Sequence, residues 1–247
     1  LPMTNDYEAK KVIERIMNLI DMERNINYSI SLGLSTKKEI RQNIQKIIAL
    51  AENHMYQNKL VNDESHRHSI IKSLEKVLQE NTNETHDHAS RMKEMVKKMV
   101  KKLNLDNNLA YELELLAKLH DIGKVSIPGK ILKKEGKLSE KEWEIVKKHP
   151  AAGYRITKTI PNLARVSYDI LCHHERWDGT GYPKGLKGKE IPLAARIISI
   201  IDAYDVMTHK RTYKEAYLKS KAIKEIKDNA GSQFDPYLAK IFLEVFS

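Results

Sequence analysis

Residues 120–124 read HDIGK and follow an apolar stretch with the spacing of a helix. His120 and Asp121 at a helix end can offer one nitrogen and one carboxylate oxygen to a metal ion, and Gly123 lets the backbone turn directly afterwards. A His–Asp pair on the protein surface is the alternative interpretation of these five residues alone. Residues elsewhere in the chain are needed to distinguish a metal-binding pair from a surface pair.

Further segments carry the same ligand chemistry. His149 ends a predicted helix before Pro150, His173 and His174 stand together ahead of a glycine-rich loop, and Asp202 interrupts the apolar run IISIIDAYDVM. A carboxylate buried in such a run costs several kcal/mol unless it is paired or coordinated, and a metal ion would supply that partner. Each histidine by itself is more often an ordinary, partly buried side chain, but the whole set favours a metal centre.

From about residue 86 to the end, the hydrophobic pattern is almost entirely helical. Ser139 with Glu142 forms a capping box, and Asp235 before Pro236 gives an N-cap followed by a first-turn proline. Apolar residues at helical spacing mark one amphipathic helix: Met92, Met95, Val96, Met99, Val100 and Leu103. These signals predict a mainly α-helical fold.

The first sixty residues have a different pattern. Residues 12–20 have a helical repeat, residues 26–34 alternate as a strand does, and the helical period returns over residues 40–55. A lone strand cannot satisfy its backbone hydrogen bonds, so we expect a fragment of a larger sheet or a strand that pairs with another chain. Residues 61–85 have a narrow apolar stripe, which predicts a connecting helix; a homodimer through this helix or the unpaired strand is a hypothesis.

Composition narrows the class of protein. The 247 residues are 41% hydrophobic and 31% charged, which indicates a globular chain, and the apolar runs are too short to span a membrane. The single cysteine, Cys172, is compatible with a reducing compartment, so a cytoplasmic protein is expected. The net charge of +10 favours anionic partners, but the basic stretches lack interleaved aromatic residues, which disfavours DNA or RNA as a partner.

Together, these segments resemble the HD-GYP phosphodiesterases, a subgroup of the HD hydrolase superfamily. The resemblance is carried by HDIGK at 120–124, HP at 149–150 followed by Gly153, HHERWDGTGYP at 173–183, and DAYDVMTHKRTYK at 202–214. A HHExxDGxGYP string with an upstream HDxGK is highly specific. The resemblance implies an HD-type helical bundle that binds metal ions and hydrolyses a cyclic dinucleotide.

The resemblance also implies a ligand set. The matching imidazoles and carboxylates are His88, His120, Asp121, His149, His173, His174 and Asp202. Glu84 lies four residues before His88, on the same helical face, and members with that glutamate resemble the trinuclear variant; a helix-surface acid is the alternative. Two or three divalent metal ions, Fe or Mn, are therefore the expected cofactors.

The same resemblance assigns roles in catalysis and binding. Asp121 is expected to bridge two metal ions and position the attacking water, while Lys124 contacts a phosphate oxygen or assists the departing oxygen. Thr212 stands where the family usually has proline, a departure that leaves the neighbouring cations in place. Further substrate contacts are expected from Asp178, Gly181, Tyr182, Arg211, Tyr213 and Lys214, with structural packing as an equal alternative for Tyr182.

The expected reaction is hydrolysis of cyclic di-GMP to linear pGpG, with GMP as a possible end product. Hydrolysis of cyclic GMP-AMP is a second hypothesis, because the motifs do not identify the residues that contact the bases. A catalytically silent sensor is a third hypothesis, and the complete set of ligand positions argues against it. A broader HD hydrolase acting on nucleotides would keep the His–Asp pair but gives no reason for the GYP loop.

A second, shorter resemblance lies upstream. SISLGLS at 29–35 and AENHMYQNK at 51–59 resemble the C-terminal part of a GGDEF diguanylate cyclase domain. The loop for which that family is named is missing, as are the upstream metal-binding carboxylates, so no cyclase activity is inferred. The expected organisation is a partial GGDEF-like α/β segment at 1–60, a connecting helix at 61–85 and an HD-GYP domain at 86–247.

Overall fold

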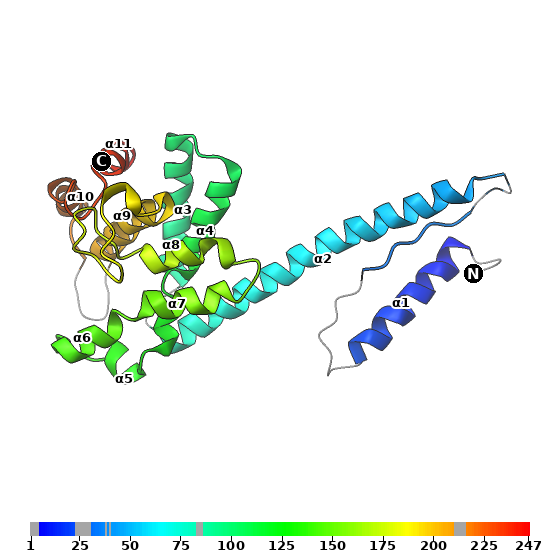
Figure 1. The fold of residues 1–247 in the computed structure, drawn as a ribbon, viewed down its shortest axis with the longest axis horizontal. Coiled ribbons are helices and arrows are strands. Elements are labelled where there is room, and N and C mark those ends of the chain that lie inside the picture. The colour runs from blue at the N-terminus through cyan, green and yellow to red at the C-terminus, as the bar shows by residue number, and fades with distance from the viewer. Residues whose placement is uncertain (1–4, 23–30, 38, 40, 83–85, 210–215) are drawn as a thin grey trace. The chain divides into compact units, whose positions relative to one another are not determined.

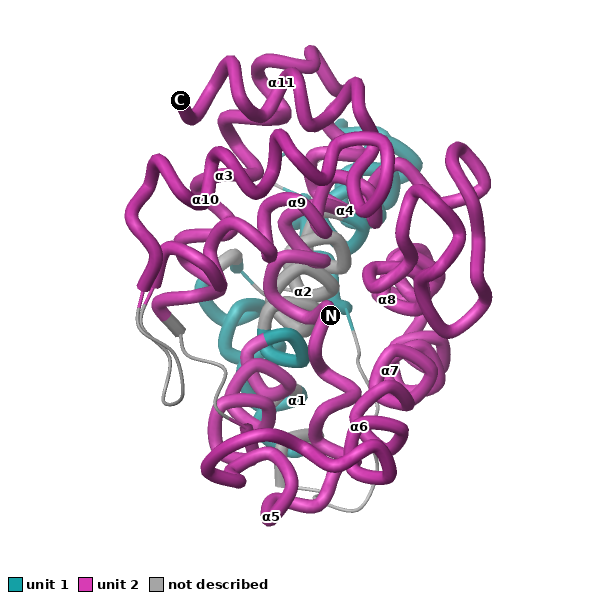
Figure 2. Tube along the Cα trace, turned by 90° about the vertical axis from the view of Figure 1, so that its left-hand side faces the viewer, with its two compact units in different colours: residues 1–71 teal, residues 72–247 magenta. Residues whose placement is uncertain are grey.

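The computed structural model describes residues 5–22, 31–37, 39, 41–82, 86–209 and 216–247. The chain divides into two compact units, Leu1–Ile71 and Lys72–Ser247, which Figure 2 distinguishes by colour. Within the described ranges, regular secondary structure is entirely helical, apart from one isolated β-bridge between Ala230 and Phe234 (Figure 1). The prediction of a mainly α-helical fold is confirmed.

The first unit contains helix α1 (Asp6–Met22) and the greater part of helix α2 (Ile44–Asn81). The segment 31–37 packs against α2. Gly33 approaches so closely that a Cβ atom added to it would come within 1.9 Å of the Ala51 carbonyl oxygen. The Leu34 carbonyl oxygen also accepts a hydrogen bond of 2.7 Å from His54 Nδ1. Only glycine fits this close approach between the segment and the helix.

The strand predicted over residues 26–34 is wrong for its described part. Residues 31–34 form no strand, and residues 26–30 lie outside the described residues. The physical reason is that a strand needs a partner. The described part of the chain offers no second strand, and alternating apolar side chains do not satisfy the hydrogen bonds of the backbone N–H and C=O groups. Helix α2, by contrast, runs without a break through both the helical pattern at 40–55 and most of the predicted connecting helix at 61–85.

The second unit contains the last turns of α2 and a bundle of further helices. These are α3 (His86–Leu103), α4 (Asn107–Leu119), α5 (Gly129–Leu132), α6 (Glu140–Val146), α7 (His149–Lys158), α8 (Ser167–Cys172), α9 (Leu193–Thr208), α10 (Lys219–Asp228) and α11 (Pro236–Phe246). A 3₁₀-helix, η1 (Ile122–Ser126), follows α4 directly. Helix α9 contacts α3, α4, α8, α10 and α11, so it forms the centre of the bundle.

The core explains why α9 is central. Four isoleucines of this helix are completely buried, including Ile197 and Ile198 in successive positions, so more than one face of α9 is apolar. A helix that is hydrophobic on several sides is stable only when other helices surround it. At its C-terminal end, Tyr204 packs edge-on against Phe242 of α11, with ring centroids 5.2 Å apart. Asp202 therefore lies on the helix at the centre of the bundle.

Two helices begin where the capping residues in the sequence predict. Ser139 and Glu142 form the predicted capping box at α6, and Asp235 accepts hydrogen bonds from the backbone of Tyr237 and Leu238 at the start of α11. Both predictions are confirmed. In the described part of the chain, no helix combines the length and the apolar character needed to cross a membrane.

The buried carboxyl of Asp169 gives a first prediction. Burial, together with the nearby Glu112 carboxylate, raises the pKa of Asp169 to about 7. Since this lies above the ordinary value of 3.8, the folded chain keeps a proton that the unfolded chain releases, and the free energy of unfolding falls as the pH rises from 4 to 7. We expect Asp169→Asn to raise the free energy of unfolding at pH 8 by up to about 4 kcal/mol.

Chemical denaturation of wild type and Asp169→Asn at pH 5 and pH 8 measures this effect. The gain from the substitution should be larger at pH 8 than at pH 5. A variant that is equally or less stable than wild type at pH 8 would contradict the account of this carboxyl.

Candidate metal centre

Five helices of the bundle position the predicted ligands. His120 caps the C-terminus of α4 and Asp121 follows it, while the remaining ligands come from α3, α7, α9 and the end of α8. The side chains form two groups whose ligand atoms lie within 4.8 Å of one another: Asp121, His149, His173 and His174, and then His88, His120 and Asp202. The structure thus brings together all the predicted ligands that it describes.

Asp121 joins the two groups. Its Oδ1 atom lies 3.1 Å from His149 Nε2 in the first group, and its Oδ2 atom lies 3.3 Å from His120 Nε2 in the second. Lys124 Nζ donates a hydrogen bond of 2.5 Å to the same Oδ2. In the second group, His88 Nε2 lies 3.6 Å from Asp202 Oδ1. The carboxylate of Asp121 therefore faces both groups at once, as a bridging ligand must.

Backbone carbonyl groups orient two of the imidazoles. His149 Nδ1 donates to the Val146 carbonyl oxygen at 2.7 Å, and His173 Nδ1 donates to the Ile170 carbonyl oxygen at 2.6 Å. With the proton on Nδ1, each ring presents an unprotonated Nε2, and the two Nε2 atoms lie 3.3 Å apart. This is the tautomer and orientation that a metal ligand requires.

Asp205 orients the imidazole of His88, a role that the sequence motifs did not predict. His88 Nδ1 donates to Asp205 Oδ2 at 2.7 Å, and Arg91 donates to both oxygens of that carboxylate, at 2.6 and 2.8 Å. Asp205 is 1% exposed. The signal was present: Asp205 lies three residues after Asp202 in the same apolar run, hence on a neighbouring position of the same helix face.

Protonation states in the centre suit metal binding. Burial by itself raises the pKa of Asp121, but the Lys124 ammonium and the His120 imidazole outweigh it, and the pKa of this carboxyl lies well below its ordinary value. Burial is the main cause that lowers the pKa of both His173 and His174, so their imidazoles are neutral at pH 7. An ionised carboxylate and neutral imidazoles are the forms that bind metal ions. The mixed nitrogen and oxygen donor set fits a first-row transition metal.

The GYP loop, residues 175–187 after α8, brings Tyr182 to the centre. Its ring lies against the His174 ring, with centroids 5.0 Å apart. Burial raises the pKa of the Tyr182 hydroxyl, and the Asp121 carboxylate adds to this effect, so the hydroxyl remains a hydrogen-bond donor. Asp178 braces the same loop, because its carboxylate accepts hydrogen bonds from the Thr180 backbone N–H and hydroxyl. The predicted substrate contacts of this loop remain predictions.

Four predicted site residues lie outside the described residues: Glu84, Arg211, Tyr213 and Lys214. Their roles also remain predictions. The described ligand groups do not depend on them.

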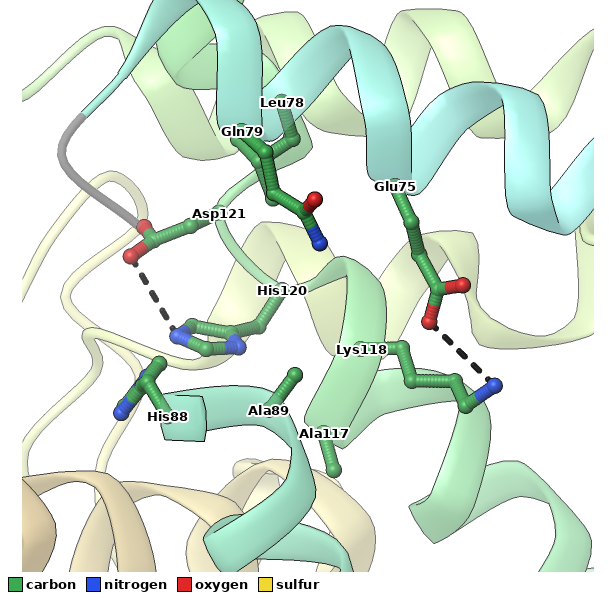
Figure 3. A pocket seen from close by; sticks show the side chains of 9 residues that line it. All are labelled: Glu75, Leu78, Gln79, His88, Ala89, Ala117, Lys118, His120 and Asp121. Carbon is green, nitrogen blue, oxygen red and sulfur yellow. Dashed lines mark ion pairs between the residues drawn. The ribbon is translucent and has the colours of Figure 1, made fainter. Parts of the chain in front are cut away.

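A pocket borders the second ligand group (Figure 3). Its space of about 300 Å³ includes open solvent, and its lining comes from α2 on one side and from α3, α4 and Asp121 on the other. The α2 residues are Glu75, Leu78 and Gln79, facing His88, Ala89, Ala117, Lys118, His120 and Asp121. Glu75 and Lys118 form an ion pair of 3.2 Å across it. The last turns of α2 therefore form one wall beside the candidate metal centre.

Gly123 gives a second prediction. A Cβ atom added there would lie 1.9 Å from the His149 carbonyl oxygen and 2.5 Å from the Gly153 backbone nitrogen, and neither backbone atom can move away cheaply. We expect Gly123→Ala to push η1 away from α7, which separates Asp121 from His149 and lowers metal content. Metal analysis of the purified variant tests this. Gly129→Ala is the matched control, because its Cβ would meet nothing within 4 Å; equal metal content in the two variants would contradict the prediction.

A family profile described as the HD domain matches residues 72–238. The chain belongs to the HD domain family. The matched range covers the described ligand residues of both groups, and its start coincides with the first residue of the second compact unit. The HD domain of this chain thus contains the whole candidate metal centre.

Curated relatives of this HD domain chain are named as phosphodiesterases. A cyclic di-GMP phosphodiesterase of Thermotoga maritima is 37% identical over 164 residues, which are 66% of this chain and 45% of that protein. A 3'3'-cGAMP-specific phosphodiesterase 2 of Vibrio cholerae is 34% identical over 177 residues, 71% of this chain and 34% of that protein. The chain therefore spans less than half the length of these relatives.

Solved structures agree with the HD-type bundle. A cyclic GMP-AMP specific phosphodiesterase of V. cholerae matches with a TM-score of 0.54 at 19% identity, covering 71% of this chain and 47% of that chain. The HD domain of the L. monocytogenes phosphodiesterase PgpH, in complex with cyclic-di-AMP, matches with a TM-score of 0.51 at 17% identity, covering 70% of this chain and 94% of that chain. At these identities the likeness concerns the fold alone. The predicted fold class is confirmed.

Proposed function

We propose that the HD domain of this chain is a metal-dependent phosphodiesterase of the HD-GYP subgroup that hydrolyses cyclic di-GMP to linear pGpG, and onward to GMP. The observation that carries the proposal is the bridging place of Asp121 between two ligand groups, with the Lys124 ammonium on its second oxygen. The names of curated relatives support cyclic di-GMP as the substrate.

The proposed cofactors are two divalent ions, Fe or Mn. The first group, around His149 and His173, would hold one ion, and the second, around His88 and His120, would hold the other, with Asp121 shared. Glu84 is proposed as a ligand of a third ion. When bound, such ions supply positive charge to a phosphodiester and lower the pKa of a coordinated water.

The chain's own residues have distinct proposed roles. Lys124 is held beside Asp121 and, being 18% exposed, keeps its ammonium at the edge of the centre, where a phosphate oxygen can accept a hydrogen bond from it. Arg211 and Lys214 are proposed to bind the phosphates, with Tyr213 beside them. Burial of the imidazoles excludes water from the side of the ligands that faces the core.

Cyclic GMP-AMP is the second candidate substrate. The observation that favours it is the similarity to V. cholerae proteins named as 3'3'-cGAMP-specific phosphodiesterases. A catalytically silent sensor is the third candidate, and it would bind a cyclic dinucleotide without turnover.

Turnover by the metal-loaded chain tests these candidates together. The purified chain is loaded with Mn²⁺ or, without oxygen, with Fe²⁺, then incubated with cyclic di-GMP or 3'3'-cGAMP, and the products are separated by chromatography. We expect cyclic di-GMP to be opened faster than 3'3'-cGAMP, and a chelator to stop turnover until metal is added back. Faster opening of 3'3'-cGAMP would replace the substrate assignment, and metal binding without turnover of either compound would reject the enzyme.

We further propose a domain organisation in which residues 1–60 are a C-terminal remnant of a GGDEF domain, 61–85 a connecting helix and 86–247 the HD-GYP domain. Homodimers through the connecting helix, in the cytoplasm, are part of this proposal. Light scattering tests the dimer, and a monomer at all concentrations would count against it.

A further inference from the structure

Glu175 is a buried carboxylate that no ligand role explains. It follows His174 directly and is 3% exposed. Its Oε1 accepts a hydrogen bond of 2.7 Å from the Lys184 backbone N–H, and its Oε2 accepts one of 3.0 Å from the Leu186 backbone N–H. A buried carboxylate is costly unless such bonds satisfy it, and bonds from backbone N–H groups to an ionised acceptor are strong. Glu175 therefore ties the far end of the GYP loop to the end of α8.

Between Glu175 and Lys184, the loop packs closely against the backbone of residues 174–176. Gly181 is so close that an added Cβ would come within 2.5 Å of Glu175 Cα and 2.3 Å of the Arg176 nitrogen. The Tyr182 backbone N–H donates to the His174 carbonyl oxygen at 3.3 Å, and the Tyr182 ring lies at 30° to the His174 ring. The place of the tyrosine thus follows from how tightly the loop is held.

The Tyr182 ring lies beside the candidate metal centre, in contact with the ring of His174. His174 belongs to the first ligand group, so the Tyr182 side chain stands next to the place where an ion would bind. A neutral hydroxyl in that place can donate a hydrogen bond to a phosphate oxygen.

We infer that Glu175 is a positioning residue: by holding the Lys184 and Leu186 backbone, it sets the place from which the Tyr182 hydroxyl donates to the substrate phosphate. The inference rests on the proposed function. Tyr182 touches the substrate, whereas Glu175 acts only through it.

A double-mutant cycle tests the inference. Glu175→Gln keeps the shape of the side chain but turns an NH₂ group toward one of the two N–H donors, and Tyr182→Phe keeps the ring but removes the hydroxyl. We expect each single variant to lower kcat on cyclic di-GMP about 10- to 100-fold at wild-type metal content. The double variant should lose little more than Tyr182→Phe alone, because the two residues act as one unit. If Glu175→Gln does not fold, Glu175→Asp, which keeps the charge on a shorter side chain, replaces it.

A measurement without substrate separates this inference from the proposed function. Trypsin needs a locally unfolded segment of backbone, so Glu175→Gln, which loosens the backbone of Lys184 and Leu186, should be cut after Lys184 faster than wild type. Glu190→Gln is the matched control, because its exposed carboxylate also accepts a backbone hydrogen bond in this loop, from Lys187 at 2.9 Å. This control should behave as wild type in both assays.

Each other outcome overturns the inference. Multiplying losses in the double variant would show that Glu175 acts independently of Tyr182, and loss of metal in Glu175→Gln would show that it acts through His173 and His174. Unchanged cleavage after Lys184 would show that Glu175 does not hold the loop. If the wild-type chain hydrolyses no cyclic dinucleotide, the proposed function fails, and the trypsin comparison still decides whether Glu175 holds the loop.

Discussion

Asp121→Asn is expected to abolish turnover and to lower the metal content of both ligand groups. The substitution keeps the volume of the side chain but removes the negative charge that faces His149 on one side and His120 on the other. It also leaves the Lys124 ammonium without its carboxylate, so positive charge stands where a cation has to bind. We expect a loss of about 10³-fold or more in kcat.

Metal analysis by mass spectrometry and the cyclic di-GMP assay measure both effects on one preparation. Asp228→Asn is the matched control, since that carboxylate pairs with Lys224 on the surface of α10 and should change neither quantity. His120→Ala should lose turnover as well, through the second group. Wild-type metal content with unchanged turnover in Asp121→Asn would reject the assignment of this residue as the bridge.

Asp205→Asn is expected to weaken both the fold and the metal centre, although Asp205 belongs to neither ligand group. It removes the carboxylate that binds Arg91 through both oxygens and orients His88. Breaking a buried ion pair on one side costs about 3–5 kcal/mol in the free energy of unfolding. Loss of a group that orients a metal-binding histidine lowers metal affinity about 10- to 100-fold.

Denaturant unfolding and a metal titration separate the two consequences. Asp235→Asn is the matched control: Asp235 is also buried and pairs with Arg196 at 2.6 Å, and its hydrogen bonds among the described residues go to Arg196 and to the backbone of α11. The control should lose stability and keep its metal affinity. Equal metal affinities of Asp205→Asn and the control would show that Asp205 is structural only.

Much of the site was predictable because its residues stand out locally. His120 and Asp121 at the end of an apolar helix, and Asp202 inside an apolar run, contradict the hydrophobic pattern around them, and only a ligand or partner resolves the conflict. The helical core was predictable because its apolar residues recur with the period of an α-helix.

Other features required three-dimensional information. Asp202 and Asp205 interrupt the same apolar run, so the sequence does not distinguish them. The packing of α9 against α3 places Asp202 near Nε2 of His88, among the ligand atoms, and Asp205 at Nδ1, on the opposite side of the ring. In the sequence, Glu175 resembles a surface acid beside a loop. It is buried because residues 184–186 fold back over it and donate backbone hydrogen bonds to its carboxylate. The alternation at 26–34 suggested a strand, but alternation does not supply the partner that a strand needs.

We propose that two groups of ligands, joined by Asp121, hold separate metal ions. Anomalous diffraction from crystals grown with Mn²⁺ and recorded at the Mn edge tests it most directly. We expect one anomalous peak among Asp121, His149, His173 and His174 and another among His88, His120 and Asp202, with Asp121 next to both peaks. Mn²⁺ bound only at other residues, or a single peak that Asp121 does not touch, would contradict it.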